Sequence, residues 1–145
     1  MIYPRKIKEP ILKQMENELV TVITGMRRVG KSYLLTDLFQ NVKTQQKLLL
    51  DLEKPENRAV FKEEGIEAII RNLETLGLKL TPKIPGQKTL ENERSYLFLD
   101  EIQNLKDINS TLKYLTDYFQ LKLIVTGSSS FYLKNLFSES LSGRK

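Results

Sequence analysis

The sequence predicts an α/β fold in which a parallel β-sheet is sandwiched between helices in three layers. Apolar runs typical of strands alternate along the chain with segments of helical periodicity. The runs lack polar alternation, which is typical of parallel strands covered on both faces. With 145 residues, 40% of them hydrophobic, the chain is long enough for one packed core. We therefore expect a single domain spanning 1–145.

Four strands are predicted from short runs rich in apolar and β-branched residues, at 19–24, 47–52, 95–100 and 121–126. Four helices are predicted from apolar residues that recur every three or four positions, at 7–16, 31–40, 66–76 and 107–119. Asn41 and Gly77 are the expected stops of the second and third helices, and Asp107 is the expected N-cap of the fourth. A turn is predicted at 53–55, and the polar stretch 81–94, with two prolines and one glycine, is expected to be a surface loop.

The composition excludes several kinds of chemistry. There is no cysteine and no histidine, so disulfides, thiolate or imidazole metal sites and histidine-based catalytic pairs are ruled out. Any bound metal is expected to be a hard cation such as Mg²⁺ or Ca²⁺, held by oxygen. The net charge of +5 fits an anionic ligand or solvated helix faces, and it is the only feature in favour of nucleic acid. No signal peptide or membrane span is recognisable, and the expected location is the cytoplasm.

The segment from Gly25 to Ser32 has the G-x-x-x-x-G-K-S pattern of a phosphate-binding loop, the Walker A motif. It lies between a predicted strand and a predicted helix, which is the context that this motif requires. Glycines let backbone N–H groups approach phosphate oxygens closely, and the helix N-terminus adds unpaired donors. Lys31 is expected to reach the β- and γ-phosphates, and Ser32 to bind Mg²⁺. The alternative is a glycine-rich turn with an exposed lysine.

A magnesium nucleotide, most simply ATP with Mg²⁺, is the cofactor that this loop predicts. Its expected binding residues are Gly25, Arg28, Val29, Gly30, Lys31, Ser32 and Tyr33. Arg27 and Arg28 lie inside the loop, where they either contact phosphate or pair with carboxylates that hold the loop's shape.

A second motif follows the third predicted strand, which ends in Asp100 and Glu101. Ligands bind at the carboxyl ends of parallel strands, so Asp100 is expected to bind Mg²⁺ as a Walker B aspartate. Glu101 is the expected general base that deprotonates the attacking water. The alternative for this pair is helix capping. Asp51, which also ends an apolar strand, is the competing magnesium ligand and ranks second.

The fourth predicted strand leads into a polar segment that contains Ser128. Ser128 is a candidate for contact with the γ-phosphate or the attacking water, and a helix-capping turn is the alternative of equal weight.

With these motifs in order, the chain resembles the AAA+ group of P-loop ATPases, and within it a set of prokaryotic ATPases. The resemblance rests on the G-x-R-R-x-G-K-S loop, on Leu99 to Gln103 (LDEIQ) and on Thr126 to Ser129 (TGSS). It implies a sheet in which the strand 121–126 lies between the strands 19–24 and 95–100. It also implies that Arg144, in the segment 141–144, senses or completes a nucleotide site, with a solvated arginine as the alternative.

The chain departs from this resemblance in two ways. Relatives continue beyond the position of Lys145 into another strand and C-terminal domains, so we expect an incomplete core with an exposed sheet edge. Relatives often carry a tryptophan soon after the LDEIQ stretch, and this chain has none.

The predicted function is an ATPase module that drives a conformational change in attached domains or partners. A nucleotide-binding regulatory module with little turnover and a P-loop kinase are the alternatives. The adjacent Asp100–Glu101 pair favours activation of water over transfer to a substrate, and no Asn-Lys-x-Asp segment that would read guanine occurs. An unidentified protein partner and a homo-oligomer are the partners considered, and nucleic acid is supported by charge alone.

Overall fold

The computed structural model describes residues 20–24, 28–62, 65–86 and 94–127 of the chain. Four parallel strands form one sheet in the order β1-β4-β3-β2. Their bounds are Thr21–Ile23 for β1, Lys47–Asp51 for β2, Ser95–Asp100 for β3 and Leu121–Thr126 for β4. The predicted parallel sheet is confirmed, and so is the position of β4 between β1 and β3. Within the described residues, β1 and β2 are the edge strands.

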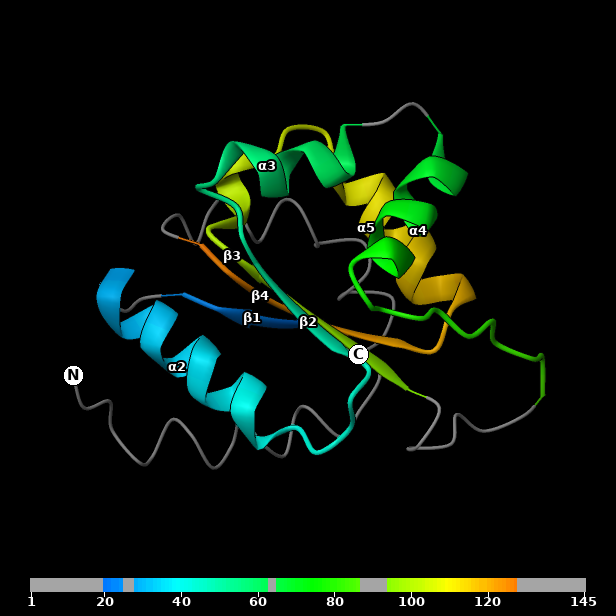
Figure 1. Cartoon of the computed structure of the whole chain (residues 1–145), viewed down its shortest axis with the longest axis horizontal. Coiled ribbons are helices and arrows are strands. Elements are labelled where there is room, and N and C mark those ends of the chain that lie inside the picture. The colour runs from blue at the N-terminus through cyan, green and yellow to red at the C-terminus, as the bar shows by residue number, and fades with distance from the viewer. Residues whose placement is uncertain (1–19, 25–27, 63–64, 87–93, 128–145) are drawn as a thin grey trace.

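Helices cover both faces of the sheet, which confirms the three predicted layers (Figure 1). The helix α2 (Arg28–Asn41) lies on one face, and α3 (Pro55–Arg58), α4 (Ile66–Thr75) and α5 (Asn109–Tyr118) lie on the other. Two short 3₁₀ turns, η1 (Ala59–Phe61) and η3 (Ile102–Asn104), follow α3 and β3. The helix predicted at 7–16 lies outside the described residues.

Each face of the sheet buries its own apolar cluster. The larger cluster combines alternate residues of β3 and β4, such as Leu97 and Leu123, with the apolar sides of α4 and α5. The smaller one packs α2 against the opposite face, where the rings of Phe39 and Phe98 meet edge to face at 5.4 Å between centroids. Because both faces are covered, every residue of β3 and β4 is buried, which explains the unbroken apolar runs of the sequence.

The end of α4 shows why Gly77 stops this helix. Gly77 has a φ of +100°, a conformation that glycine adopts without the steric cost of a Cβ. The N–H of Leu78 donates to Leu73 O at 3.0 Å and that of Gly77 to Glu74 O at 3.0 Å, a Schellman motif. The predicted stop is confirmed.

At the end of α2, Lys47 Nζ donates to Phe39 O at 2.8 Å and to Val42 O at 3.0 Å.

One local prediction is wrong. Asp107 is not the N-cap of α5, because the helix begins at Asn109 with Ile108 as its N-cap and no side-chain cap bond. Asp107 has a φ of 53°, in the left-handed region that aspartate tolerates better than most residues. The turn predicted at 53–55 is present directly after β2, and it runs into α3, because Pro55 sits in the first helical turn, where its missing N–H costs nothing.

The expected loop 81–94 is partly ordered by the corner between α5 and β4. Pro82 bridges Phe119 in antiparallel fashion, and the N–H of Gln120 donates to Thr81 O at 2.8 Å. Lys83 adds an N–H bond of 2.9 Å to Tyr118 O. The first residues of this segment are therefore fixed by backbone pairing, while 87–93 lie outside the described residues.

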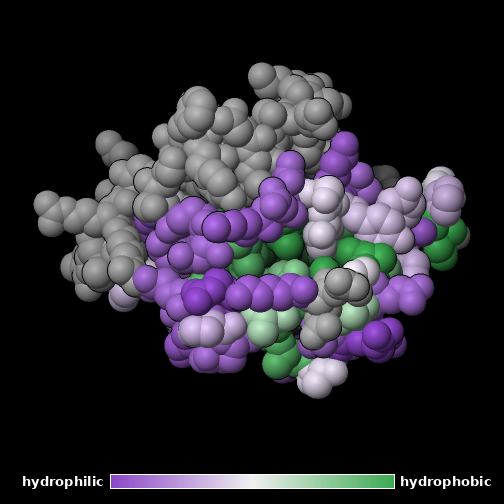
Figure 2. Space-filling view, turned by 90° about the horizontal axis from the view of Figure 1, so that it is seen from above, coloured by the Kyte–Doolittle hydropathy of each residue, from purple (hydrophilic) through white to green (hydrophobic). Residues whose placement is uncertain are grey.

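Figure 2 looks onto the side of the molecule that carries α3, α4 and α5. Hydrophilic side chains predominate there and surround a strip of hydrophobic surface. In the part of the chain that the structure describes, no helix is both long enough and apolar enough to span a membrane.

Candidate nucleotide site

The candidate site lies at the carboxyl edge of the sheet, beside the start of α2. All four strands run in the same direction, so they end at one edge of the sheet. The helix α2 begins there at Arg28, three residues earlier than the sequence predicts. Its first turns carry a buried glycine, Gly30, followed by Lys31 and Ser32. The sequence motif and the ends of β3 and β4 thus meet at one place.

Lys31 is almost completely buried, with 1% of its surface exposed. Its Nζ donates to the backbone oxygen of Gly127, just after β4, at 2.5 Å. It also lies 3.8 Å from Glu101 Oε1. A buried ammonium needs acceptors or an opposite charge around it. The fold provides both here, so it can hold a cation against the edge where an anionic ligand would bind.

Asp100 is held by two hydroxyl groups from different elements. Ser32 Oγ donates to Asp100 Oδ2 at 2.7 Å, and Thr126 Oγ1 donates to Asp100 Oδ1 at 2.5 Å. The hydroxyl and the carboxylate that the sequence assigned to Mg²⁺ are therefore in direct contact. Both groups offer hard oxygen, which suits Mg²⁺, and Mg²⁺ usually keeps several waters and binds only one or two carboxylates. Among the described residues, no group of three or more acidic side chains is placed to hold a metal ion. A Mg²⁺ site with one or two carboxylates does not require such a group.

Glu101 has an unusual backbone for a residue with a side chain. Its φ of 61° and ψ of 56° place it in the left-handed region, which costs a non-glycine residue roughly 1–2 kcal/mol. Gln103 Nε2 donates to Glu101 Oε2 at 2.7 Å, whereas Glu101 Oε1 is buried with no hydrogen-bond partner. Strained residues of this kind cluster at functional sites. The left-handed bend turns the chain sharply after β3 and directs the carboxylate toward Lys31.

Thr126 is the functional candidate that sequence reasoning missed. Besides donating to Asp100, its hydroxyl accepts the N–H of Glu101 at 3.0 Å. One hydroxyl thus links both acidic residues to the neighbouring strand. The signal in the sequence was a polar residue at the end of an apolar strand. In the structure, this residue follows Val125, which is paired with Leu99 in the register of β4 and β3. The sequence interpretation instead assigned the polar role on this segment to Ser128.

Asp51 lies beside Asp100, because the two residues are paired in the register of β2 and β3. Its carboxylate accepts the N–H of Glu53 at 3.0 Å, which stabilises the turn after β2. The hydroxyl of Ser32 contacts Asp100. Asp100 thus contacts the second residue assigned to Mg²⁺, and its ranking above Asp51 as the magnesium ligand stays a prediction.

Several predicted site residues cannot be placed. Gly25, Arg27, Ser128 and Arg144 lie outside the described residues, as do the side chains of Arg28 and Val29. Tyr33 is on α2 with 49% of its surface exposed, next to Ser32. The structure therefore brings together Lys31, Ser32, Asp100 and Glu101 of the predicted set. The roles of all the predicted site residues stay predictions.

Comparison with known proteins agrees with this arrangement. Residues 17–145 match the family described as the AAA domain. The chain belongs to the AAA domain family. Membership of this family places the chain, called the AAA domain below, among nucleotide-binding, ATPase-like modules. Its four-stranded parallel sheet is that of a P-loop NTPase of the AAA+ type.

The AAA domain is also similar to individual proteins. An uncharacterized protein of Haemophilus influenzae is 25% identical over 149 residues, which cover 99% of this chain and 34% of that protein. The structure of PCH-2 from C. elegans superposes with a TM-score of 0.59 and 15% identity, covering 96% of this chain and 42% of the other. Cdc6p from Pyrobaculum aerophilum gives a TM-score of 0.48 at 18% identity, covering 94% and 42%. The chain therefore spans about a third of the Haemophilus relative and less than half of these two structures.

Proposed function

We propose that this AAA domain binds ATP with Mg²⁺ and hydrolyses it, as the motor or switch module of a larger protein. The observation that carries the proposal is the convergence of Lys31 and Ser32, at the start of α2, with Asp100 and Glu101, at the end of β3. A cation, a hydroxyl and two carboxylates at the edge of a parallel sheet are the groups that a magnesium nucleotide requires.

Each residue has a role that its surroundings support. Lys31 would exchange Gly127 O and Glu101 for phosphate oxygens, because its head group already lies at this edge. Ser32 and Asp100 would hold Mg²⁺, which neutralises developing negative charge on the phosphates when it is bound. Glu101 would accept the proton of the attacking water through Oε1, the carboxylate oxygen that lacks a hydrogen-bond donor. Gln103 would keep the other oxygen of Glu101 in place.

The alternative is a nucleotide-binding switch with little turnover, and one observation favours it. Glu101 lies 3.8 Å from Lys31, with both side chains buried, so its carboxylate is partly committed to the lysine. In such a module, the Glu101 carboxylate separates from Lys31 only when a partner or a second copy of the chain acts on the site. Homo-oligomerisation and a protein partner therefore remain part of the proposal for the larger protein.

The test is a thermal-shift measurement with and without nucleotide. Mg-ATP at about 100 times its dissociation constant should stabilise the fold by roughly 2.7 kcal/mol. The same titration on Lys31→Ala should give a much smaller shift, because the phosphates lose their buried cation. GTP is the matched ligand control, and Lys113→Ala, an exposed lysine on α5, is the matched protein control. A melting curve that neither ATP nor GTP moves would contradict the proposal.

A further inference from the structure

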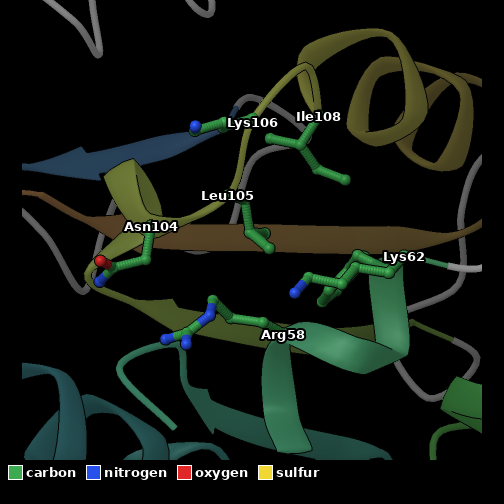
Figure 3. Close-up of a pocket in the computed structure, with 7 residues that line it drawn as sticks. Arg58, Lys62, Asn104, Leu105, Lys106 and Ile108 are labelled. Atoms are coloured by element: carbon green, nitrogen blue, oxygen red, sulfur yellow. The ribbon is translucent and has the colours of Figure 1, made fainter. Parts of the chain in front are cut away.

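A cavity of about 300 Å³ lies between the segments that follow β2 and β3. Its seven lining residues come from α3, η1 and the residue after η1 on one side, and from η3 and the connection between η3 and α5 on the other. They are Arg58, Phe61, Lys62, Asn104, Leu105, Lys106 and Ile108. Figure 3 shows side chains of the two segments facing each other, with Lys62 and Leu105 extending into the space between them. None of these residues is among the predicted residues of the nucleotide site, and Asn104 is bonded to one that is, Glu101.

The lining of this cavity is strongly cationic. Arg58, Lys62 and Lys106 contribute three positive charges, and none of the seven lining residues is acidic. Lys62 and Lys106 are exposed, and within the described part of the chain neither forms an ion pair. Glu63 and Glu64, which follow Lys62 in the sequence, lie outside the described residues. Three cations with no carboxylate among them form a lining that favours a polyanionic group.

Arg58 is fixed in place rather than free to swing into solvent. Its Nη1 donates to Leu52 O at 2.9 Å and to Glu53 O at 2.8 Å. A guanidinium has five N–H donors in a planar fork, so the two used by the backbone leave Nε and Nη2 for another acceptor. An anchored arginine loses little conformational entropy when it binds an anion, which is the usual advantage of arginine in phosphate sites.

The floor of the cavity is apolar, because Phe61, Leu105 and Ile108 are all buried. A lining of this kind suits a ligand with an apolar or aromatic body as well as an anionic end. Small-molecule sites commonly combine a hydrophobic lining with a few polar groups and start at about 300 Å³, so the volume suits a compact ligand.

One wall of the cavity is bonded directly to Glu101. Asn104 Nδ2 donates to Glu101 O at 3.0 Å, and the N–H of Asn104 donates to the same oxygen at 3.2 Å. This carbonyl belongs to the strained, left-handed residue that caps the N-terminus of η3. A ligand that contacts the Asn104 amide therefore acts on the turn that orients the Glu101 carboxylate.

We propose that this pocket binds a small phosphate monoester with an aromatic or apolar body, and that Asn104 transmits its occupancy to Glu101. The binding part stands independently of nucleotide hydrolysis. The transmission part rests on the function proposed above, because it matters only if Glu101 acts as the base.

The probe is phenyl phosphate, titrated into the ¹⁵N-labelled chain while amide chemical shifts are followed. Amides of the pocket residues should shift in a saturable manner, and the amides of Glu101 and Gln103 should shift with them. Inorganic phosphate and phenol, titrated separately, should each bind more weakly, because each provides only one half of the recognised chemistry.

Charge reversal tests where the probe binds. The double variant Lys62→Glu/Lys106→Glu should raise the dissociation constant of phenyl phosphate roughly ten-fold or more, a factor equivalent to about 1.4 kcal/mol. The matched control Lys43→Glu/Lys113→Glu changes two other exposed lysines by the same charge and should bind like the parent chain. Equal affinity in both double variants would overturn the pocket assignment.

Two further outcomes are decisive. If Lys31→Ala abolishes binding of phenyl phosphate and the pocket variants do not, the probe occupies the nucleotide site and the proposal is wrong. If a fifteen-nucleotide oligothymidylate shifts the pocket amides and phenyl phosphate does not, the pocket is a nucleic-acid contact and the small-ligand assignment fails. Pocket binding without a shift at Glu101 would refute the transmission through Asn104. Because ATP binding is measured separately, its failure would leave the pocket result unaffected.

Discussion

Thr126 offers the sharpest test of how the site is held together, because its hydroxyl joins three elements of structure. We expect Thr126→Val to lower the stability of the fold and Thr126→Ser to preserve most of it. Valine keeps nearly the same shape but has no hydroxyl, so the change removes polar contacts and not volume. Thr126 is fully buried, so water cannot easily replace the lost partner.

The magnitude follows from the two hydrogen bonds that the hydroxyl makes. Its bond to the Asp100 carboxylate is to a charged group, a class that contributes about 1.5–3 kcal/mol. The N–H of Glu101 would lose its acceptor, and a buried unsatisfied donor costs about 1–3 kcal/mol. The lower ends of these ranges together predict a loss of roughly 2.5 kcal/mol. For a domain of this size, that corresponds to a fall in Tm of roughly 5–10 °C.

The assay is urea denaturation followed by circular dichroism, with thermal melting as a second measurement. The valine variant should show a lower midpoint with an unchanged slope, because the native surface area is the same. The serine variant is the control, since it retains the hydroxyl and loses one methyl group. If the valine variant is as stable as the parent chain and the serine variant is less stable, the methyl group of Thr126 contributes to stability. The hydroxyl link between Asp100 and Glu101 would then contribute nothing measurable.

The remaining predictions concern the acidic residues and one turn. Glu101→Gln should bind Mg-ATP as the parent chain does and release no phosphate in a coupled assay, and unchanged turnover would remove Glu101 from the base role. Measured by calorimetry, Asp100→Asn should reduce the magnesium dependence of ATP binding far more than Asp51→Asn does. The opposite result would make Asp51 the magnesium ligand in place of Asp100. Gly77→Ala should lower the free energy of unfolding, measured by denaturant titration, by roughly 1 kcal/mol. A φ of +100° is strained for alanine, although nothing lies within 4 Å of the added Cβ. A neutral result would indicate that the turn after α4 relaxes.

Patterns that depend on local chemistry were predictable from the sequence. The strands β2, β3 and β4 lie within a residue of their predicted bounds, because each is a mostly apolar run in a sheet covered on both faces. The meeting of Ser32 with Asp100 also followed, since parallel strands end at one edge and the helix after the loop starts there.

Features that depend on contacts formed only in the folded chain were not predictable. The left-handed backbone of Glu101 is compensated by bonds from Thr126, Gln103 and Asn104, and no local preference of glutamate favours it. Asp107 looked like an N-cap because capping residues are common before helices. Its left-handed backbone instead places it in the connection between η3 and the buried Ile108, which precedes the helix. The first residues of 81–94 gained order from the α5–β4 corner, which the sequence pattern does not reveal.

The contact between Lys31 and the carbonyl of Gly127 has a consequence for synthesis of the chain. The two residues are 96 positions apart, and Ser32 and Asp100 are 68 apart. Closing such long loops is slow relative to forming local structure. A growing chain on the ribosome therefore carries the segment from Gly25 to Ser32 long before β4 emerges to complete the edge. If ATP binds as proposed above, tight binding should appear only after residue 127 has left the exit tunnel, and its onset would then report completion of the sheet.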